Sequence, residues 1–348
     1  MIAPAAVTVL LAACSVAAAS RVAAQRPVPA DTVPITEWQV PWEKTRPRDP
    51  FVDPTEPRVW FVGQEGNYVA YLTPKTGQFK RYELPDGTNP HNVILAPDGG
   101  VWYSGNRNGR IGKLDARTGK VTEYMMPDAA ARDPHTLVFD QRGDLWFTVQ
   151  GGNYVGKLTT ATGRVQLLKV PTPRARPYGI VVDSKNRIWF NEFGANKIGS
   201  VDPNTMALRE YSLPNENARG RRIAVTSDDK VWYVDYTRGF LGRLDPATGK
   251  VDEWAAPSAG RSLPYAMTVD DRDRLWFVET GVQPNRLVGF DSKTQQFFGI
   301  TAVGSGGGTI RHMIFHKPTG DIWFGSDVNT IGRAQVSRVA PKPKIASE

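Results

Sequence analysis

The sequence predicts an all-β protein, a seven-bladed β-propeller of four-stranded antiparallel blades that an N-terminal strand closes. The first observation is a repeat, because a Trp followed by Phe or Tyr occurs seven times at intervals of 42 to 47 residues. The seven pairs are Trp60-Phe61, Trp102-Tyr103, Trp146-Phe147, Trp189-Phe190, Trp232-Tyr233, Trp276-Phe277 and Trp323-Phe324. A period in the low forties fits one blade of four short strands. The second observation is that short apolar runs alternate with turn residues, without a helical period in the repeats.

Residues 88–127 illustrate one repeat. The apolar run 92–96, the segment 101–103, the segment 110–114 and the segment 121–124 are separated by Gly- and Asn-containing turns. These are four strand signals joined by three hairpin signals. The recurring Trp is best interpreted as a packing residue between neighbouring blades, since large aromatic side chains dominate core burial.

The two ends of the chain indicate how the ring closes. Four outer-strand segments contain an aromatic residue with Pro three positions later, and the same pattern occurs before the first repeat at Trp38 and Pro41. The last repeat stops after its third strand, near residues 331–333. We therefore expect residues 35–41 to pair with residues 328–334, which removes two free sheet edges.

The chain is expected to comprise a signal peptide (1–24), a linker (25–34), the propeller (35–337) and a C-terminal tail (338–348). The apolar N-terminal stretch is too short to span a membrane and is followed by small residues before Gln25, which is typical of an export signal. A periplasmic or secreted protein is expected. The only cysteine, Cys14, lies in this leader in a context that also fits a lipoprotein lipobox, so a lipoprotein is the alternative.

Composition excludes several classes of partner. The net charge is +8, but Lys and Arg are spread through every repeat, so we expect no nucleic-acid binding. We also expect a monomer without a transmembrane segment. No Ser-His-Asp order, phosphate loop or cysteine cluster is present, which argues against the common hydrolase, nucleotide and zinc chemistries.

Two series of residues keep a constant offset from the repeated Trp. Eleven residues before it, where the innermost strand begins, lie His91, His135, Tyr178, Arg221, Tyr265 and His312, with Pro50-Phe51 nearest in the irregular first blade. Three residues after it lie Gly63, Gly105, Val149, Glu192, Asp235, Glu279 and Ser326. Because antiparallel neighbours bring these positions to the same edge, both series should line one face at the mouth of the channel.

This face is the candidate site for a small-molecule ligand. Three of the four histidines of the chain occupy it, although Pro-His is also interpretable as a structural habit of the repeat. Blades four to six lack this histidine and carry acids and nearby arginines instead, which suit an anionic ligand. The candidate ligand-binding residues are Tyr178, Glu192, Arg221, Arg222, Asp235, Tyr265, Glu279 and Arg311.

The repeated pattern resembles the streptogramin B lyase (virginiamycin B lyase) family. It is clearest between Pro177 and Pro214, which contain Trp189-Phe190-Asn191-Glu192 and an Asn-Lys-Ile-Gly segment at 196–199. The resemblance covers residues 35 to about 335. It implies a seven-bladed propeller that opens a cyclic depsipeptide by elimination, with a magnesium ion and a histidine base.

The resemblance also suggests where catalytic groups would lie. His312 matches the base, but Ile310 and Ser326 stand where the family has glutamates, and Tyr265 replaces a second histidine. In a rotated register, His91 and Asp133-Pro134-His135 occupy adjacent blades, with Val149 in place of a glutamate. The candidate catalytic residues are His135, His312 and His91, and Asp133 is the candidate magnesium ligand.

Two functions follow from these residues. The first, which the resemblance implies, is an exported lyase acting on a cyclic ester or related substrate in the central channel, in which a divalent cation polarises a carbonyl while a neutral histidine removes the neighbouring proton. The second is a non-catalytic periplasmic propeller that binds an anionic small molecule, sugar or peptide. A set of carboxylates around one metal would favour the enzyme, and an arginine-lined channel would favour the binding protein.

Overall fold

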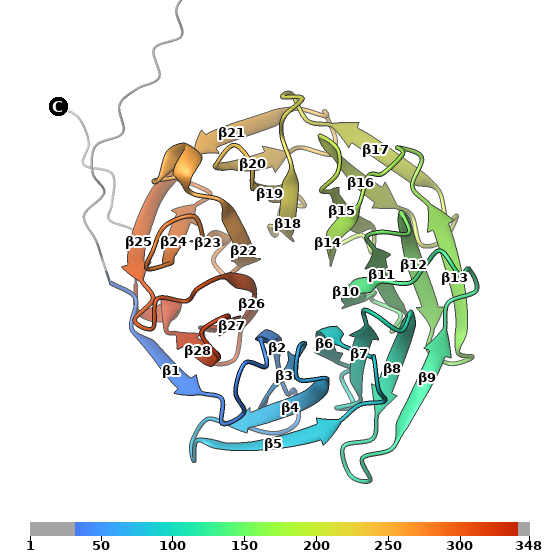
Figure 1. Cartoon of the computed structure of the whole chain (residues 1–348). Helices are drawn as coiled ribbons and strands as arrows, with labels where there is room; N and C mark the ends of the chain where they lie inside the picture. The colour runs from blue at the N-terminus through green and yellow to red at the C-terminus, as the bar shows by residue number, and fades with distance from the viewer. Residues whose placement is uncertain (1–31, 340–348) are drawn as a thin grey trace, which may run out of the picture.

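The computed structural model describes residues 32–339 and contains seven four-stranded antiparallel sheets around one axis (Figure 1). The innermost strands are β2 (Pro47–Val52), β6 (Pro90–Leu95), β10 (Pro134–Phe139), β14 (Pro177–Val182), β18 (Gly220–Val225), β22 (Pro264–Val269) and β26 (Ile310–His316). The second strands are β3 (Val59–Gly63), β7 (Val101–Gly105), β11 (Leu145–Val149), β15 (Ile188–Glu192), β19 (Val231–Asp235), β23 (Arg274–Glu279) and β27 (Asp321–Ser326). The predicted fold is confirmed.

The outer half of each blade completes the sheet. The third strands are β4 (Tyr68–Thr73), β8 (Arg110–Leu114), β12 (Tyr154–Thr159), β16 (Lys197–Val201), β20 (Phe240–Leu244), β24 (Arg286–Asp291) and β28 (Thr330–Ala334). The outer strands are β5 (Gln78–Glu83), β9 (Val121–Met125), β13 (Arg164–Lys169), β17 (Leu208–Ser212), β21 (Val251–Ala255), β25 (Gln296–Ala302) and β1 (Ile35–Gln39). Two 3₁₀ turns, η1 (Ala259–Arg261) and η2 (Val336–Arg338), are the described helical segments, and no helix among residues 32–339 is suited to crossing a membrane.

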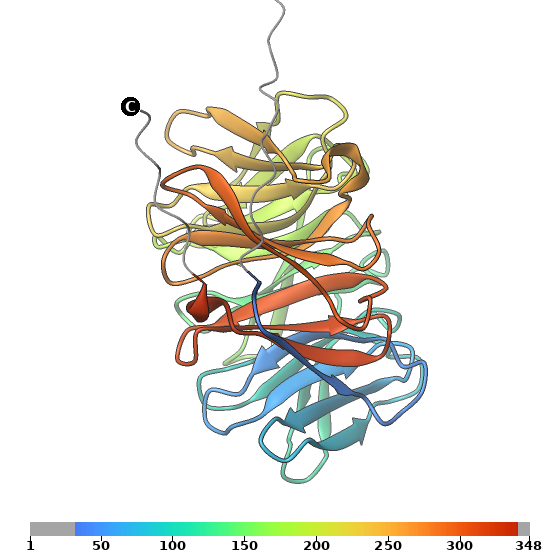
Figure 2. The same ribbon diagram turned by 90° about the vertical axis from the view of Figure 1, so that its left-hand side faces the viewer.

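Strand β1 completes the seventh blade, as the sequence predicts. It pairs antiparallel with β28, with Ile35 opposite Ala334 and Gln39 opposite Thr330. Figure 2 shows this N-terminal strand lying against the C-terminal strands of the same blade. The first and last parts of the chain are therefore held in one sheet, which leaves no unpaired third strand at the junction.

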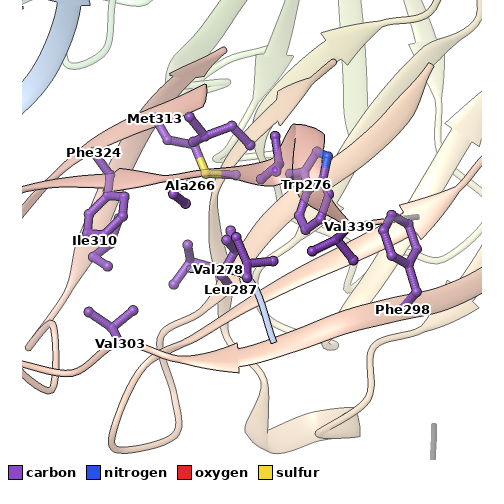
Figure 3. Packing of buried hydrophobic residues seen from close by; sticks show 14 residues of the cluster. Ala266, Trp276, Val278, Leu287, Phe298, Val303, Ile310, Met313, Phe324 and Val339 are labelled. Atoms are coloured by element: carbon purple, nitrogen blue, oxygen red, sulfur yellow. The ribbon is translucent and has the colours of Figure 1, made fainter. Parts of the chain in front are cut away.

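The recurring Trp residues pack between blades. Trp276 of blade six lies in a buried cluster with Ile310 and Phe324 of blade seven (Figure 3). Its indole Nε1 donates a hydrogen bond to Asp270, at 2.9 Å, and equivalent bonds hold Trp60, Trp146 and Trp189. These bonds satisfy the one polar atom of a buried indole. The interpretation of the Trp as a packing residue is confirmed.

Several third strands contain a glycine for a steric reason. A Cβ atom at Gly199 would overlap the ring of Phe190, which pairs with it across the sheet. Equivalent overlaps would occur at Gly156 with Phe147 and at Gly332 with Phe324. In these blades the glycine of the third strand therefore makes room for the aromatic residue that follows Trp.

Candidate functional site

Every innermost strand contains a bulge near its first residues. In blade four, Pro177 pairs with Glu192 and Ile180 pairs with Phe190, so that two residues oppose Asn191 alone. The same slip occurs in the other six blades. A bulge bends the strand and re-aims its side chains. Two successive residues of each strand can therefore contact residues of other blades near the axis.

Four side chains expected at the channel mouth pack on one another instead of lining an opening. The ring centroids of His91 and His135 are 3.4 Å apart, and those of His135 and Tyr178 are 4.2 Å apart. The hydroxyls of Tyr178 and Tyr265 are hydrogen-bonded to each other. Each of these four side chains is at most 3% exposed. The sequence predicts these residues at one level of the channel, and the structure brings these four side chains into contact, so that they fill the channel there.

Arg221 covers this group with its guanidinium. Its Cζ lies 3.6 Å from the ring centroid of Tyr265, 4.1 Å from that of Tyr236 and 4.8 Å from that of Phe193. Such contacts stabilise a cation that has lost part of its hydration. Its Nε atom is buried without a hydrogen-bond partner, and no carboxylate pairs with Arg221 within residues 32–339. The positive charge of Arg221 is thus held by aromatic residues, without a carboxylate partner in the described part of the chain.

Blade one supplies two site residues that the sequence analysis missed. Pro47 pairs with Gly63 as Pro90 pairs with Gly105, so Arg48 occupies the position that His91 has in blade two. The expectation that Pro50-Phe51 holds this position is wrong, because the bulge of blade one is displaced by one residue. Asp49, the following residue, is completely buried. The available signal was the offset itself, since Asp49 lies eleven residues before Trp60.

A buried charge cluster surrounds Asp49. Arg48 Nε donates to Asp49 Oδ1 at 3.0 Å, and Arg222 Nη2 lies 3.5 Å from Oδ2. Asn92 Nδ2 also donates to Oδ2, at 3.0 Å. Arg222 is fixed further by a bond from Nη1 to Thr136 Oγ1, at 3.0 Å. Two buried guanidiniums therefore share a single carboxylate.

The electrostatics of the cluster follow from this arrangement. Although burial raises the pKa of Asp49, the nearby cations, above all the guanidinium of Arg48, hold it well below its ordinary value. Burial, together with Arg48 and Arg222, lowers the pKa of the three channel histidines, to about 4 for His312. The histidines are consequently neutral near pH 7, and they add no charge to the site.

The two tyrosines of the site differ in acidity. Burial raises the pKa of Tyr178, but Arg221, Arg222 and Arg48 outweigh burial and lower it below the usual value. Burial and Tyr178 raise the pKa of Tyr265 to about 12. Tyr178 is thus the more acidic of the two hydroxyls that share this hydrogen bond.

The predicted acids reach the expected edge, but two of them are engaged by their own loops. Asp235 accepts hydrogen bonds from the backbone of Arg219 and pairs with Arg238 at 3.2 Å. Glu279 accepts bonds from Ser258 and pairs with Arg286 at 2.8 Å. Both carboxylates are completely buried. They stabilise the loops of this face rather than adding negative charge to the channel.

Glu192 is the exception among the acids. Both of its carboxyl oxygens are buried without a hydrogen-bond partner among the described residues. Burial, with the nearby charge of Glu210, raises its pKa to about 8. The side chain is therefore protonated at neutral pH in the folded protein.

Asp133 and Arg311 also have local partners. The Asp133 oxygens accept bonds from the backbone nitrogens of Gly151, at 2.6 Å, and Gly152, at 3.2 Å. No hydrogen bond or ion pair connects Asp133 with His135 within residues 32–339. Arg311 forms an ion pair with Asp327. Neither side chain joins the cluster around Asp49 through its own charge.

The residues present do not fit the magnesium ion that the family resemblance implies. In blade seven, Ile310 is buried in an apolar cluster, and the Ser326 hydroxyl is hydrogen-bonded to Thr330. In blade three, the Asp133 carboxylate holds a turn, and Val149 offers no donor atom. Among the described residues, no group of three or more His, Cys, Asp or Glu side chains is arranged to hold a metal ion. A hard cation needs several oxygen ligands, and the channel presents guanidiniums instead.

Comparison with known proteins places the chain among related propellers. A streptogramin B lyase structure matches with a TM-score of 0.78 and 26% identity, over 87% of this chain and 97% of that chain. Virginiamycin B lyase from Staphylococcus aureus matches with a TM-score of 0.78 and 24% identity, over 87% and 99%. The extracellular domain of a one-component system from B. thetaiotaomicron shares the fold alone, with a TM-score of 0.65 and 16% identity over 88% of this chain and 41% of that chain.

Among curated proteins, no relative matches this chain. The family profile of Virginiamycin B lyases matches residues 28–287, which are most of the repeats. The offsets of the repeated Trp, the closure by β1 and the match to the streptogramin B lyase structure agree with this assignment. The chain belongs to the Virginiamycin B lyase family.

Proposed function

We infer that this protein is an exported propeller that binds an anionic small molecule in its central channel without catalysing a reaction. The observation that carries this proposal is the excess of positive charge near the axis. Arg48, Arg221 and Arg222 bring three guanidiniums, whereas Asp49 is the carboxylate that Arg48 and Arg222 share. Buried charges are costly unless they are paired. An anionic ligand would supply the missing negative charge.

The chemistry of the site supports binding better than elimination. A lyase mechanism requires carboxylates around a divalent cation, and the positions concerned hold Ile310, Ser326 and Val149. It also requires a histidine of suitable basicity, and burial lowers the pKa of His312 to about 4. A base of such low pKa gives little driving force for removing a proton. Arginines, by contrast, bind carboxylates and phosphates in defined geometry.

Binding of simple anions tests the proposal. Isothermal titration of the purified protein at low ionic strength with acetate, malonate and phosphate should show saturable binding that weakens as salt increases. Arg222→Gln should weaken binding at least about tenfold, and Arg222→Lys should restore part of it. Arg117→Gln is the matched control, because the Arg117 side chain is 85% exposed in the turn between β8 and β9.

The alternative function has its own readout. Quinupristin, which is present in a structure of an inactive variant of the S. aureus enzyme, should remain intact with this protein and magnesium. Elimination products that depend on magnesium, or the absence of binding for all three anions, would overturn the proposal.

Export is a separate part of the proposal, and it rests on the sequence alone. The expected signal peptide, residues 1–24, lies outside the residues that the structure describes. The small residues before Gln25 support cleavage at that point. Intact mass spectrometry of the native protein should give a chain that begins near Gln25. A mass that includes an acylated Cys14 would establish a lipoprotein, and an intact Met1 would remove the export proposal.

A further inference from the structure

The central channel contains a cavity of about 540 Å³ on the side towards which the innermost strands end. All seven innermost strands contribute residues to its lining, and β6, β10, β14, β18 and β22 do so up to their last residue. It lies next to the histidine and tyrosine group, but His91, His135, Tyr178 and Tyr265 are not among its lining residues. A volume of this size is typical of a site for a small organic ligand. The cavity is therefore distinct from the filled end of the channel.

The wall of this cavity is apolar. Side chains near the ends of the strands, including Val181, Val182, Val269 and Ile314, line it and remain partly exposed. Fully buried apolar residues would be expected if the channel were only a packing core. Apolar surface that faces water without a partner is unfavourable and is typical of a ligand-binding groove. The wall is suited to an aliphatic or aromatic group.

The inner end of the cavity is polar. Arg222, His312, Asn92 and Thr136 line it at the level of the bulges. Asn92 and Thr136 already have partners, whereas His312 Nδ1 is buried without a hydrogen-bond partner in the described part of the chain. Arg222 shares Asp49 with Arg48, so the inner end keeps a net positive charge. This end is suited to a negatively charged group.

We propose that the ligand of this channel is an amphiphilic carboxylate, whose apolar chain lies along the strand ends and whose carboxylate reaches Arg222 and His312. The inference rests on the proposed anion-binding function and specifies both the ligand class and the half of the channel that admits it. The chain would cover the partly exposed apolar wall. The carboxylate would pair with the guanidinium of Arg222 and accept a hydrogen bond from the neutral imidazole of His312.

A chain-length series tests the proposal. Affinities of acetate, butanoate and octanoate are measured by isothermal titration on the purified protein, with 1-octanol as the uncharged match of octanoate. Each added methylene should strengthen binding by about fourfold until the cavity is full. Octanoate should therefore bind at least about 100-fold more tightly than acetate. It should also bind at least about tenfold more tightly than 1-octanol, because the alcohol cannot pair with Arg222.

A variant that fills the cavity locates the apolar chain. Thr268 lines the cavity, is partly exposed and forms no side-chain hydrogen bond within residues 32–339. Thr268→Trp should weaken octanoate binding at least about tenfold and change acetate binding less than about twofold. Thr76→Trp, at an exposed turn of blade one, is the control and should leave both affinities unchanged. Melting curves of both variants verify that the fold is retained.

The outcomes separate this inference from the proposed function. Binding of all carboxylates with equal affinity, or octanoate binding that is insensitive to Thr268→Trp, would overturn the amphiphile and keep the anion-binding function. Equal affinities for 1-octanol and octanoate would overturn the role of Arg222. Failure of every anion to bind would overturn both proposals.

Discussion

The two halves of the central channel are built from the same seven strands, yet they differ in what occupies them. At the start of the strands, His91, His135, Tyr178 and Tyr265 are almost completely buried and contact one another. At the end of the strands, residues such as Val181 are partly exposed around a cavity. The polar half is thus held by mutual contacts, whereas the apolar half lacks a partner within the described chain.

This difference indicates which half of the channel would give a ligand specificity and which half would give it binding energy. Buried polar and charged side chains need partners, and Arg222 finds Thr136 and Asp49 on other blades. Apolar side chains have no directional requirement, and here they surround a cavity. A ligand would therefore gain binding energy from the apolar wall and specificity from the residual charge of the polar half.

Opening the ring should have the largest effect, since it disrupts both halves at once. A chain that begins at Pro41 lacks β1 and exposes the edge of β28, whereas a chain that begins at Asp31 retains the pairing of Ile35 with Ala334. The shorter chain should melt more than about 10 °C below the longer one in differential scanning calorimetry. Equal melting temperatures for the two chains would show that β1 does not stabilise the ring.

Removing the carboxylate of Asp49 should destabilise the polar half of the channel and leave the apolar half unchanged. Asp49→Asn leaves Arg48 and Arg222 buried without a counter-charge, and such changes cost about 3–5 kcal/mol. Chemical denaturation measures the loss. Asp327→Asn is the control, because its ion pair with Arg311 is partly exposed and should contribute less than about 1 kcal/mol. Similar effects of both substitutions would contradict the special role of Asp49.

Acid should weaken the polar half through His312. Its pKa is about 4 in the folded protein, below the ordinary histidine value of 6.5, so the unfolded chain binds a proton first as the pH falls. The stability associated with neutral His312 is present above pH 6.5 and is lost as the pH falls towards 4. At pH 5 the loss amounts to roughly 2 kcal/mol.

Comparison with His312→Asn isolates this contribution. Glu192 acts in the opposite direction, because its raised pKa of about 8 gives stability that is lost as the pH rises from 4.5 to 8. That contribution is common to both proteins. Denaturation at pH 7.5 and pH 5 should show a smaller acid loss for His312→Asn than for the wild type. Parallel pH profiles would refute the assignment to His312.

Truncation in the apolar half should have the smallest effect. Val181 is partly exposed to the cavity, so Val181→Ala should cost less than about 1 kcal/mol in denaturation experiments. Val93 is completely buried between blades one and two, and Val93→Ala should cost roughly 1.5–3 kcal/mol. If the two losses were equal, Val181 would be packed as tightly as the core, and the contrast between the halves would disappear.

Several features of the site were predictable because they follow from the repeat. Constant offsets from Trp place His91, His135 and Tyr178 at equivalent positions in successive blades, and the structure brings them into contact. Arg48 of blade one was not predictable in the same way. Its bulge is displaced by one residue, which moved Arg48 away from the offset used for the other blades.

The partners of the acids could not be predicted either. Asp133 binds the backbone of Gly151 and Gly152 rather than His135, and Glu279 binds Ser258. These partners belong to other strands and loops of the sheet. The offset of a residue from Trp gives its position along the channel axis. It does not give the direction in which its side chain points after a bulge.

The sequence by itself determined the number of blades, the closure by β1 and the level of the polar residues in the channel. A single blade cannot bury its own apolar faces, so the repeat must recur with a fixed period. The last repeat lacks its outer strand, and the N-terminal segment carries the pattern of that strand. The tertiary structure alone decided which charges meet at Asp49, which end of the channel is filled and where the cavity lies. These features depend on side chains from different blades that converge on one axis, and the distances among them do not exist until the ring closes.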